Sequence, residues 1–397
     1  MKIKQLILMI LTILVFGVVS YKIYKKNIDN KINVIPFNNS DNSFDYNIIH
    51  LISENETNQL ISPYSIAYAL SILNEGAKGN TKDQINKVIY NYHLNNNLNI
   101  KNKIGIANAL FIKDKYKNNI NNEFITTIKN KYNSEILFDE FKNPNIINSW
   151  VNEKTYQMID KNLENLDDEF TLGIANALAI DVEWERKFEP NLTYKDNFIK
   201  LDNTRKLVDM MSSKNDVKYI ENKNAKGIIK SYEKVDDINL EFIAILPNND
   251  LKTYINNFNK NEFNNLIKSQ KNSNSNLDIY TSIPKFKFGY DYLNFKKDLI
   301  KLGIIDAFDY EKANFRNMIN KDSNMDLYLD TALHKTFIDL NENGTKASAV
   351  TFFGMYATSA LEQPKEEIII KFNRPFLFII KEKNSDNILF FGTIYEP

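Results

Sequence analysis

The residues from Asn341 to Phe376 decide the fold, and they read NENGTKASAVTFFGMYATSALEQPKEEIIIKFNRPF. Polar residues and a glycine open this stretch, a run of mostly small residues follows, and bulky apolar residues come next. The strand-like sequence IIIKF and a Pro-Phe pair close it. A loop of this length is uncommon in a compact domain and indicates a function.

The same stretch also has the pattern of a β-strand, in which alternate side chains point to opposite faces of a sheet. Between Gly344 and Tyr356, Lys346 carries the one charge, and it would lie on the face that can stay in water. Small residues can slide over a packed core without overfilling it, and Gly344 tolerates the backbone rotation of a hinge. A loop built to become a strand is one interpretation, and a long exposed hairpin loop with incidental small residues is the alternative. The nearly uncharged face would carry Thr345, Ala347, Ala349, Thr351, Phe353 and Met355.

The composition allows a large core and sets limits on function. The chain has 397 residues, of which 43% are hydrophobic, and length alone would allow two or three domains. The 50 basic and 50 acidic side chains balance, so nucleic acid or another bulk polyanion is not an expected partner. Cysteine is absent from the sequence, which excludes disulfides, thiolate metal sites and a cysteine nucleophile.

Residues 1–26 have the pattern of an export segment. An apolar run from Leu6 to Val19 lies between lysines, and its length suits a signal peptide better than a spanning helix. A signal peptide cleaved after Ser20 and an uncleaved membrane tether through residues 6–21 are the two alternatives. Both predict an exported protein, either secreted or anchored on the outer side of a membrane. The polar, asparagine-rich residues 27–42 are expected to form a linker.

The local patterns predict individual elements and argue against an enzyme. Ser62-Pro63 is a good helix start, and Gly76 and Gly79 are expected to end that helix. The apolar segment 104–112 predicts a strand. The three histidines lack metal-binding spacing such as HExxH, and no GxSxG motif is present. We therefore expect no catalytic residue, no metal and no cofactor. Residues 85–100 offer mainly asparagine rather than clustered basic residues, so heparin is not an expected partner.

The chain resembles the serpin family from about Ser43 to Pro397. Asn58 with Ser62-Pro63-x-Ser65-Ile66, followed by ALSILNEGAKGNT, is similar to the opening signature of that family. Further segments match in family order: IANALF (106–111), INSWVNEKTYQMID (147–160), IANALAIDVEWERKF (174–188), FIAILP (242–247), IPKFKF (283–288), LGIIDAFDYEKANF (302–315), LHKTFIDLNENGTKASA (333–349), FNRPFLFII and ILFFGTIYEP.

The resemblance implies an α+β fold in one monomeric domain at 43–397, with three β-sheets and a shell of about eight or nine helices. It also implies an exposed reactive-centre loop at about 342–366. The implied function is inhibition of a serine-type endopeptidase, which attacks the loop and is trapped as an acyl-enzyme when the cut loop inserts into the main sheet. The alternative is a non-inhibitory serpin, with a carrier, chaperone or structural role. Such relatives tend to lose small hinge residues or to gain charge or proline there, and this hinge has no proline.

The resemblance also assigns roles to individual residues. The cluster called the shutter, beneath the opening of the main sheet, is expected to contain Ser62, Ser65, Asn176 and His334, and Trp184 is expected at the top of that sheet. An ordinary core histidine and a plain core aromatic are the alternatives for His334 and Trp184. The expected hinge residues are Glu342, Asn343, Gly344, Thr345, Ala347, Ser348 and Ala349, with departures from the family pattern at Lys346 and Val350.

The cut site follows from the usual length of the family's loop. Counting from Glu342 places the reactive bond at Thr358-Ser359, and this loop is longer than is common beyond that point. Elastase-like or subtilisin-like proteases would suit that bond, and chymotrypsin-like enzymes would suit a bulkier residue. Cysteine proteases are further possible targets. The alternative positions are Tyr356, Ala357 and Leu361.

The sequence Asn343-Gly344-Thr345 is a glycosylation sequon inside the hinge. A glycan there would obstruct insertion of the loop, so the sequon predicts an export route without N-glycosylation, as in a bacterium.

Overall fold

The computed structural model describes residues 44–94, 98, 100, 103–155, 157, 159, 163–166, 170–292, 295–345 and 365–397. The predicted export segment and linker, and residues 346–364 of the predicted reactive loop, lie outside these ranges. Within the described residues, no helix is long and apolar enough to cross a membrane.

The helix predicted at Ser62-Pro63 is α3 (Pro63–Gly76). The Ser62 hydroxyl accepts a hydrogen bond from the Ser65 amide at 3.1 Å, which caps the first turn, and Pro63 occupies the first helical position. A Cβ at Gly76 would lie 2.2 Å from the buried Met318 side chain, which would have to shift, so glycine suits the end of the helix. The predicted start and the end at Gly76 are confirmed, but Gly79 does not end this helix: it is the first residue of the next one, α4 (Gly79–Val88).

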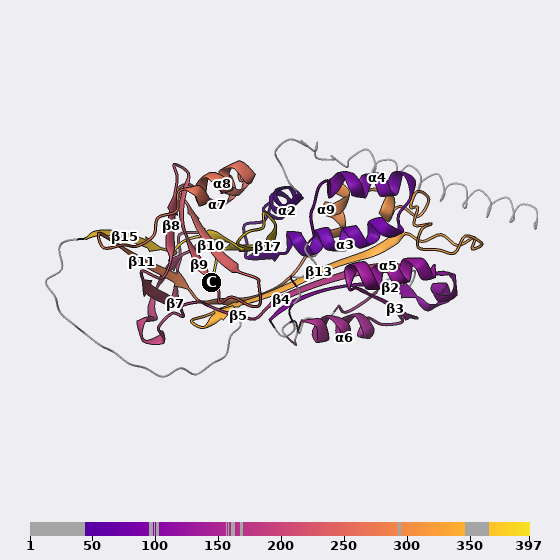
Figure 1. Cartoon of the computed structure of the whole chain (residues 1–397), viewed down its shortest axis with the longest axis horizontal. Coiled ribbons are helices and arrows are strands. Elements are labelled where there is room, and N and C mark those ends of the chain that lie inside the picture. Colours follow the sequence, from indigo (N-terminus) through magenta and orange to yellow (C-terminus); the bar gives the residue numbers. More distant parts are fainter. Residues whose placement is uncertain are drawn as a thin grey trace, which may run out of the picture.

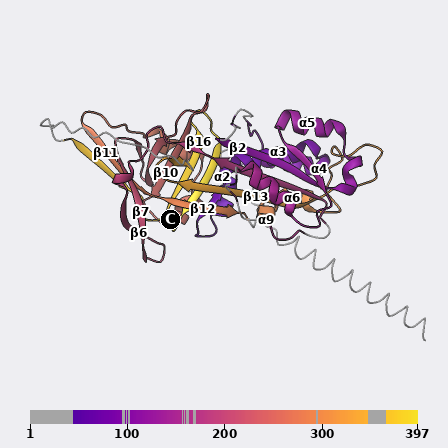
Figure 2. The same ribbon diagram turned by 90° about the horizontal axis from the view of Figure 1, so that it is seen from below.

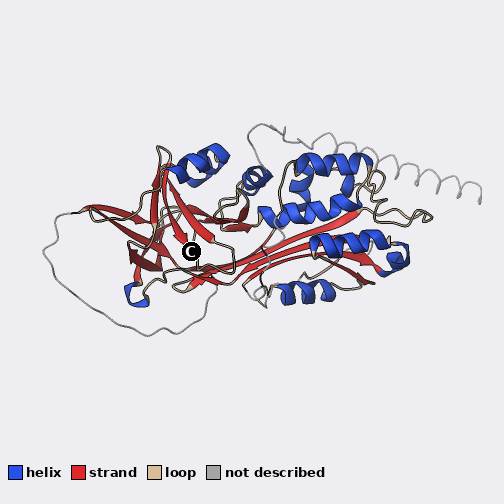
Figure 3. Ribbon diagram, in the orientation of Figure 1, coloured by secondary structure: helices blue, strands red, loops and turns tan. Residues whose placement is uncertain are grey.

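Most helices gather around one end of the molecule, while two of the three sheets and two short helices occupy the other end (Figures 1 and 3). Helices and three sheets in one chain confirm the predicted α+β class. Besides α3, the α-helices of the described residues are α2 (Phe44–Ile52), α4 (Gly79–Val88), α5 (Asn122–Tyr132), α6 (Asn145–Lys154), α7 (Leu251–Asn256), α8 (Lys260–Lys268) and α9 (Phe295–Lys301).

The largest sheet contains the predicted strand at 104–112 and has seven strands. Its middle strands β4 and β13 run parallel, whereas β4 is antiparallel to β2 and β13 is antiparallel to β12. The sheet is composed of β3 (Glu135–Asp139), β2 (Ile104–Lys113), β4 (Leu172–Ile180), β13 (Leu329–Leu340), β12 (Phe286–Asp291), β5 (Val182–Glu183) and β14 (Gly344–Thr345).

Two further sheets complete the structure. Strands β16 and β17 lie inside the six-stranded sheet and are almost wholly buried, and β15 pairs in parallel with β11 in the four-stranded sheet. The six-stranded sheet contains β1 (Gln59–Ile61), β17 (Ile388–Ile394), β16 (Phe376–Glu382), β10 (Leu240–Pro247), β9 (Ala225–Ser231) and β8 (Lys218–Glu221). The four-stranded sheet contains β15 (Glu366–Lys371), β11 (Leu277–Pro284), β7 (Arg205–Lys214) and β6 (Tyr194–Ile199).

Both faces of the large sheet are covered, which explains why every residue of β4 is buried. Helix α6 packs on one face, where Trp150 lies edge-on to Phe111 and contributes to a cluster with Ala175 and Ala177. Helix α3 packs on the other face, against β4 and β2 (Figure 2). We call the parallel pairing of β4 and β13, from Leu172 and Leu329 to Leu178 and Thr336, the seam.

Candidate functional site

The predicted hinge begins as a strand inside the large sheet. After a turn at Asn341, strand β14 runs antiparallel to β13 and to β5 at the same time. Thr345 is paired with Leu340 on one side and with Val182 on the other. The first two residues of the hinge strand are therefore already seated at one end of the seam.

Gly344 is required here because two backbones approach each other closely. A Cβ on Gly344 would lie 2.2 Å from the carbonyl oxygen of Val182 and 2.6 Å from the Cα of Glu183. Neither atom belongs to a side chain that could rotate away. Glycine at this position is thus explained by a close approach, in addition to the rotation that the sequence suggested.

Aromatic side chains form the floor beneath the seated strand. Trp184 stacks on Tyr232 with ring centroids 4.4 Å apart, and the Tyr232 hydroxyl lies 2.6 Å from the hydroxyl of Thr345. The Trp184 indole donates to the Asn341 carbonyl at 3.0 Å, and its backbone amide donates to the Asn343 carbonyl at 2.8 Å. Burial raises the pKa of Tyr232, so its neutral hydroxyl is available for the contact with Thr345.

Glu342 is fixed by charge and by hydrogen bonds. Its carboxylate lies 2.9 Å from the Lys285 ammonium and accepts a hydrogen bond from the Thr193 hydroxyl. Burial acts to raise the pKa of Glu342, but the bonds from Lys285 and Thr193 outweigh it and hold the pKa below its usual value. The Phe188 amide donates to the Glu342 carbonyl at 3.0 Å. The turn before β14 is therefore tied to two other segments, the connection between β5 and β6 and the residue before β12.

A polar row crosses the middle of the large sheet. Asn108 of β2, Asn176 of β4 and His334 of β13 are aligned in register. The Asn176 amide donates to Asn108 at 2.6 Å and to the Ser65 carbonyl at 2.8 Å. Its amide oxygen lies 2.8 Å from His334 Nδ1. These buried groups join three strands to the first turn of α3.

His334 is bonded through both ring nitrogens. Its Nε2 accepts a hydrogen bond from the Ser62 amide at 3.0 Å, so Nδ1 carries the proton and donates to Asn176. Desolvation by burial lowers the pKa of His334 to about 3. The imidazole is therefore neutral at physiological pH, as this bonding pattern requires. It is both a satisfied core histidine and a link across the seam.

The structure brings together the predicted shutter residues but also includes residues that the sequence did not single out. Asn108 had a usable signal, because IANAL occurs at 106–110 and again at 174–178. Tyr232 and Lys285 had none, since each reaches the hinge from a distant segment. Within the described residues, no group of three or more histidine or acidic residues could hold a metal ion. The predicted residues outside the described ranges are Ala347, Ser348, Ala349, Tyr356, Ala357, Thr358, Ser359 and Leu361.

Residues 39–397 match the family described as "Serpin (serine protease inhibitor)". This chain is a serpin. A serpin-like protein of the archaeon Methanosarcina acetivorans is 31% identical over 371 residues, which covers 88% of this serpin and 84% of the relative. Serine proteinase inhibitor 1 of Variola virus is 30% identical over 360 residues, which covers 86% of this serpin and 92% of the viral protein. The crystal structure of the thermophilic serpin tengpin in its native state superposes with a TM-score of 0.77 at 32% sequence identity. The match covers 91% of this serpin and 95% of the tengpin chain.

Gly344→Ala should destabilise this serpin because the added methyl group would meet backbone atoms of β5. We expect a loss of about 1–3 kcal/mol in the free energy of unfolding and faster exchange of the Thr345 amide with deuterium. Gly289→Ala in β12 is the matched control, because a Cβ there meets nothing closer than 3.7 Å. Equal losses in the two variants, measured by urea unfolding, would contradict the role assigned to the close approach.

His334 predicts a pH dependence of stability. Its pKa is about 3 in the folded serpin against 6.5 for the free side chain, so the unfolded chain binds the extra proton between these values. The contribution of His334 is complete above pH 6.5 and declines as the pH falls, by at most about 1.4 kcal/mol per pH unit. Asp45 acts in the opposite direction, because burial raises its pKa to about 7.

Comparison with His334→Gln isolates the histidine, since Asp45 is common to both proteins. Urea unfolding between about pH 4 and 7 should give a curve for the variant that lacks the decline attributed to His334. Parallel curves for the two proteins would show that His334 does not titrate in this way.

Proposed function

We propose that this serpin inhibits a serine-type endopeptidase as a suicide substrate. The observation that carries the proposal is the position of β14, which is already paired with β13 and β5 at the end of a parallel seam. A strand that continued from Thr345 would meet the seam directly. It would run antiparallel to β13 and to β4, because these two strands are parallel to each other.

Insertion would change the hydrogen bonding of the whole sheet. The seam is one parallel ladder, and parallel pairing is slightly less stable per residue than antiparallel pairing. A strand between β4 and β13 would replace that ladder with two antiparallel ones. At roughly 0.5–1.5 kcal/mol for each net hydrogen bond over about ten residues, together with apolar burial, the gain rivals the stability of a typical domain.

The side-chain pattern of the loop suits this route. Thr345 is 2% exposed, and its hydroxyl meets Tyr232 on the inner side of the sheet. Continued alternation would bring Ala347 and Ala349 to the same face, and both are small enough to pass over a packed core. Lys346 and Ser348 would face the other side.

In the uncut protein, loop insertion is slow because it must first break existing hydrogen bonds. These are the seam ladder and the hydrogen bond between His334 and Asn176. Both contribute a kinetic barrier, so the native state persists although an inserted state is more stable. Cutting the loop frees one end of it and lowers that barrier.

The trapping step follows from acyl transfer. The protease hydroxyl attacks the carbonyl carbon of the residue before the cut, the peptide C–N bond breaks, and the leaving amine takes a proton. The new acyl ester joins the protease to the loop. Insertion then moves the protease before water can hydrolyse that ester. The partner is thus a serine protease held in a covalent complex with a serpin monomer.

The residue before the cut in the loop determines which class of protease this serpin would inhibit. A cut at Thr358-Ser359 favours elastase-like or subtilisin-like enzymes, and a cut after Tyr356 or Leu361 favours chymotrypsin-like ones. We place the serpin outside the cytoplasm on the pattern of residues 1–26, either secreted or tethered through residues 6–21. Incubation with a panel of these proteases and with cysteine proteases, followed by mass spectrometry of the C-terminal fragment, locates the bond.

A nick within residues 346–364 should make the protein more stable if the loop inserts. The unfolding midpoint is expected to rise by roughly 10 °C or more relative to the intact chain, measured by circular dichroism. The uncut protein taken through the same incubation without protease is the control. An unchanged midpoint after complete cutting would favour the non-inhibitory alternative.

Ala347→Arg should convert the inhibitor into a substrate. The substitution puts a charge on the face that Thr345 turns inward, so insertion would be slow compared with hydrolysis of the ester. The serpin should then be cleaved without a band of covalent complex on denaturing gels. Ser348→Arg places the same charge on the opposite face and should keep the complex. Retained trapping in Ala347→Arg would refute the face assignment.

A further inference from the structure

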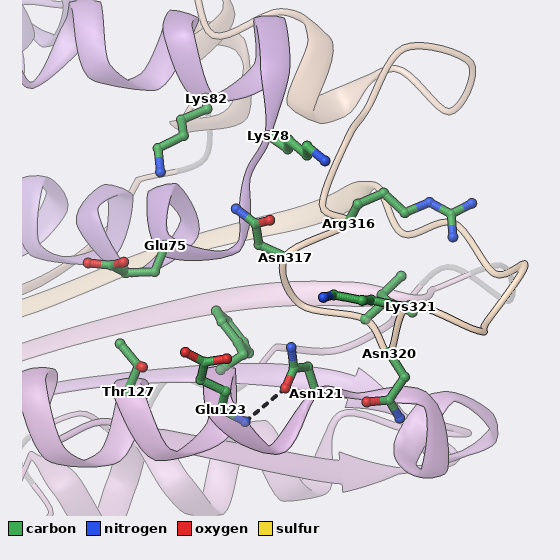
Figure 4. Close-up of a pocket in the computed structure, with 12 residues that line it drawn as sticks. Glu75, Lys78, Lys82, Asn121, Glu123, Thr127, Arg316, Asn317, Asn320 and Lys321 are labelled. Atoms are coloured by element: carbon green, nitrogen blue, oxygen red, sulfur yellow. Dashed lines mark hydrogen bonds between the residues drawn. The ribbon is translucent and has the colours of Figure 1, made fainter.

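A polar hollow of about 550 Å³ lies at the end of the molecule formed by α3, α4, α5 and the loop that leads into β13 (Figure 4). Its size is in the range of small-molecule sites, but its lining is mostly charged and amide side chains. None of the residues used above for inhibition contributes to it. The residues that line it are Glu75, Lys78, Lys82, Asn121, Glu123, Phe124, Thr127, Arg316, Asn317, Ile319, Asn320 and Lys321.

Three lysines of the hollow are not neutralised by an ion pair with an acidic side chain in the part of the chain that the structure describes. Among the described residues, Lys78, Lys82 and Lys321 make no ion pair within 4.0 Å. Figure 4 shows the ammonium ends of Lys82 and Lys321 directed into the space from different walls, with the amide of Asn317 between them. Arg316, at the rim, is bonded to Asp326 at 2.8 Å.

The acidic side chains offset this charge only in part. The Glu75 carboxylate lies 2.5 Å from the Lys131 ammonium and 2.7 Å from the Tyr132 hydroxyl. Burial acts to raise the pKa of Glu75, but these two bonds and the nearby Lys82 hold it below its usual value. Glu123 lies in the first turn of α5, where the helix dipole stabilises a carboxylate. The ammonium groups of Lys82 and Lys321 are thus directed into a hollow in which Glu123 is the carboxylate without a cationic side-chain partner among the described residues.

We propose that this hollow binds a compact anion with two or more phosphate or sulfate groups, and that the bound anion holds the two sides of the seam together. Lysine ammonium groups and side-chain amides are donors that suit phosphate and sulfate oxygens. The hollow lies between three walls, and its limited volume favours a compact anion over a long polysaccharide. Its amide groups and the Thr127 hydroxyl can also receive a polyhydroxylated anion such as a sugar phosphate.

The anion would hold the seam together because the two walls of the hollow are connected to strands on opposite sides of that seam. Helix α5 lies between β2 and β3 along the chain, and both strands are on the β4 side of the seam. Residues 316–321 lead into β13, on the other side. The two walls meet at a backbone bridge, in which the Asn121 amide donates to Met318 and the Asn320 amide donates to Asn119, each at 2.8 Å. An anion between these walls would strengthen the same connection.

Titration calorimetry with sodium tripolyphosphate tests the binding. The intact protein should bind one equivalent saturably, beyond the effect of sodium chloride at equal ionic strength, since exposed charges are screened by salt. Lys82→Ala and Lys321→Ala should each weaken binding by about fivefold or more, because a charged hydrogen bond is lost. Lys87→Ala, on α4 but outside the hollow, is the matched control and should bind like the wild type.

Three results would overturn the binding site. One is the absence of saturable binding to a protein that unfolds cooperatively. Another is an equal loss of affinity in Lys87→Ala. The third is binding only of long sulfated polysaccharides with no effect of Lys321→Ala, which would place the anion elsewhere.

The coupling to the seam rests on the proposed function and has its own readout. By reciprocity, an anion that favours the closed seam must bind the intact chain more tightly than the nicked, inserted chain. We expect a difference of about fivefold or more in tripolyphosphate affinity. Equal affinity for an intact and a heat-stabilised nicked protein would overturn the coupling. A nicked protein without added heat stability would instead contradict the inhibitor mechanism, while binding to the intact chain would stand.

Discussion

The parallel pairing of β4 and β13 is the constraint on which the rest of the structure depends. Two parallel neighbours can accept between them one strand that is antiparallel to both, and β14 already occupies the end of that position. The close approach at Gly344, the stacked pair of Trp184 and Tyr232, and the charge contact of Glu342 all serve to hold this short strand in place. Strand β14 therefore lies between β13 and β5, and next to it β4 and β13 pair directly with each other.

The polar row across the sheet joins β2, β4 and β13 through side-chain hydrogen bonds. Buried polar groups are costly unless they are bonded, and Asn108, Asn176 and His334 bond one another and the start of α3. Apolar side chains in the same positions would join the strands through packing alone. Hydrogen-bonding groups give the closed sheet a definite register, and they are also able to find new partners when strands move apart. On the α6 face, by contrast, Ala175 and Ala177 contribute small apolar side chains to a buried cluster.

Local sequence patterns predicted individual helices and strands, but they could not predict contacts between residues that are far apart in the sequence. Ser62-Pro63 determined the start of α3, and the apolar run at 104–112 determined β2, since caps and burial act within a few residues. The resemblance to serpins supplied the sheets and also named His334 and Asn176, which the structure places in contact. Tyr232 and Lys285 could not be found in this way. They reach the hinge from β9's end and from the segment before β12, and their partners are far away in the sequence.

The anchoring of the segment after the loop has a consequence for any molecule cut within residues 346–364. Downstream of such a cut, β15 stays paired with β11, while β16 and β17 form the interior of the six-stranded sheet with most side chains fully enclosed. The severed tail is thus an internal component of the body rather than a loose end. A cleaved molecule would therefore migrate as a single species on a native gel. Its N-terminal and C-terminal fragments would separate only after a denaturant unfolds the core.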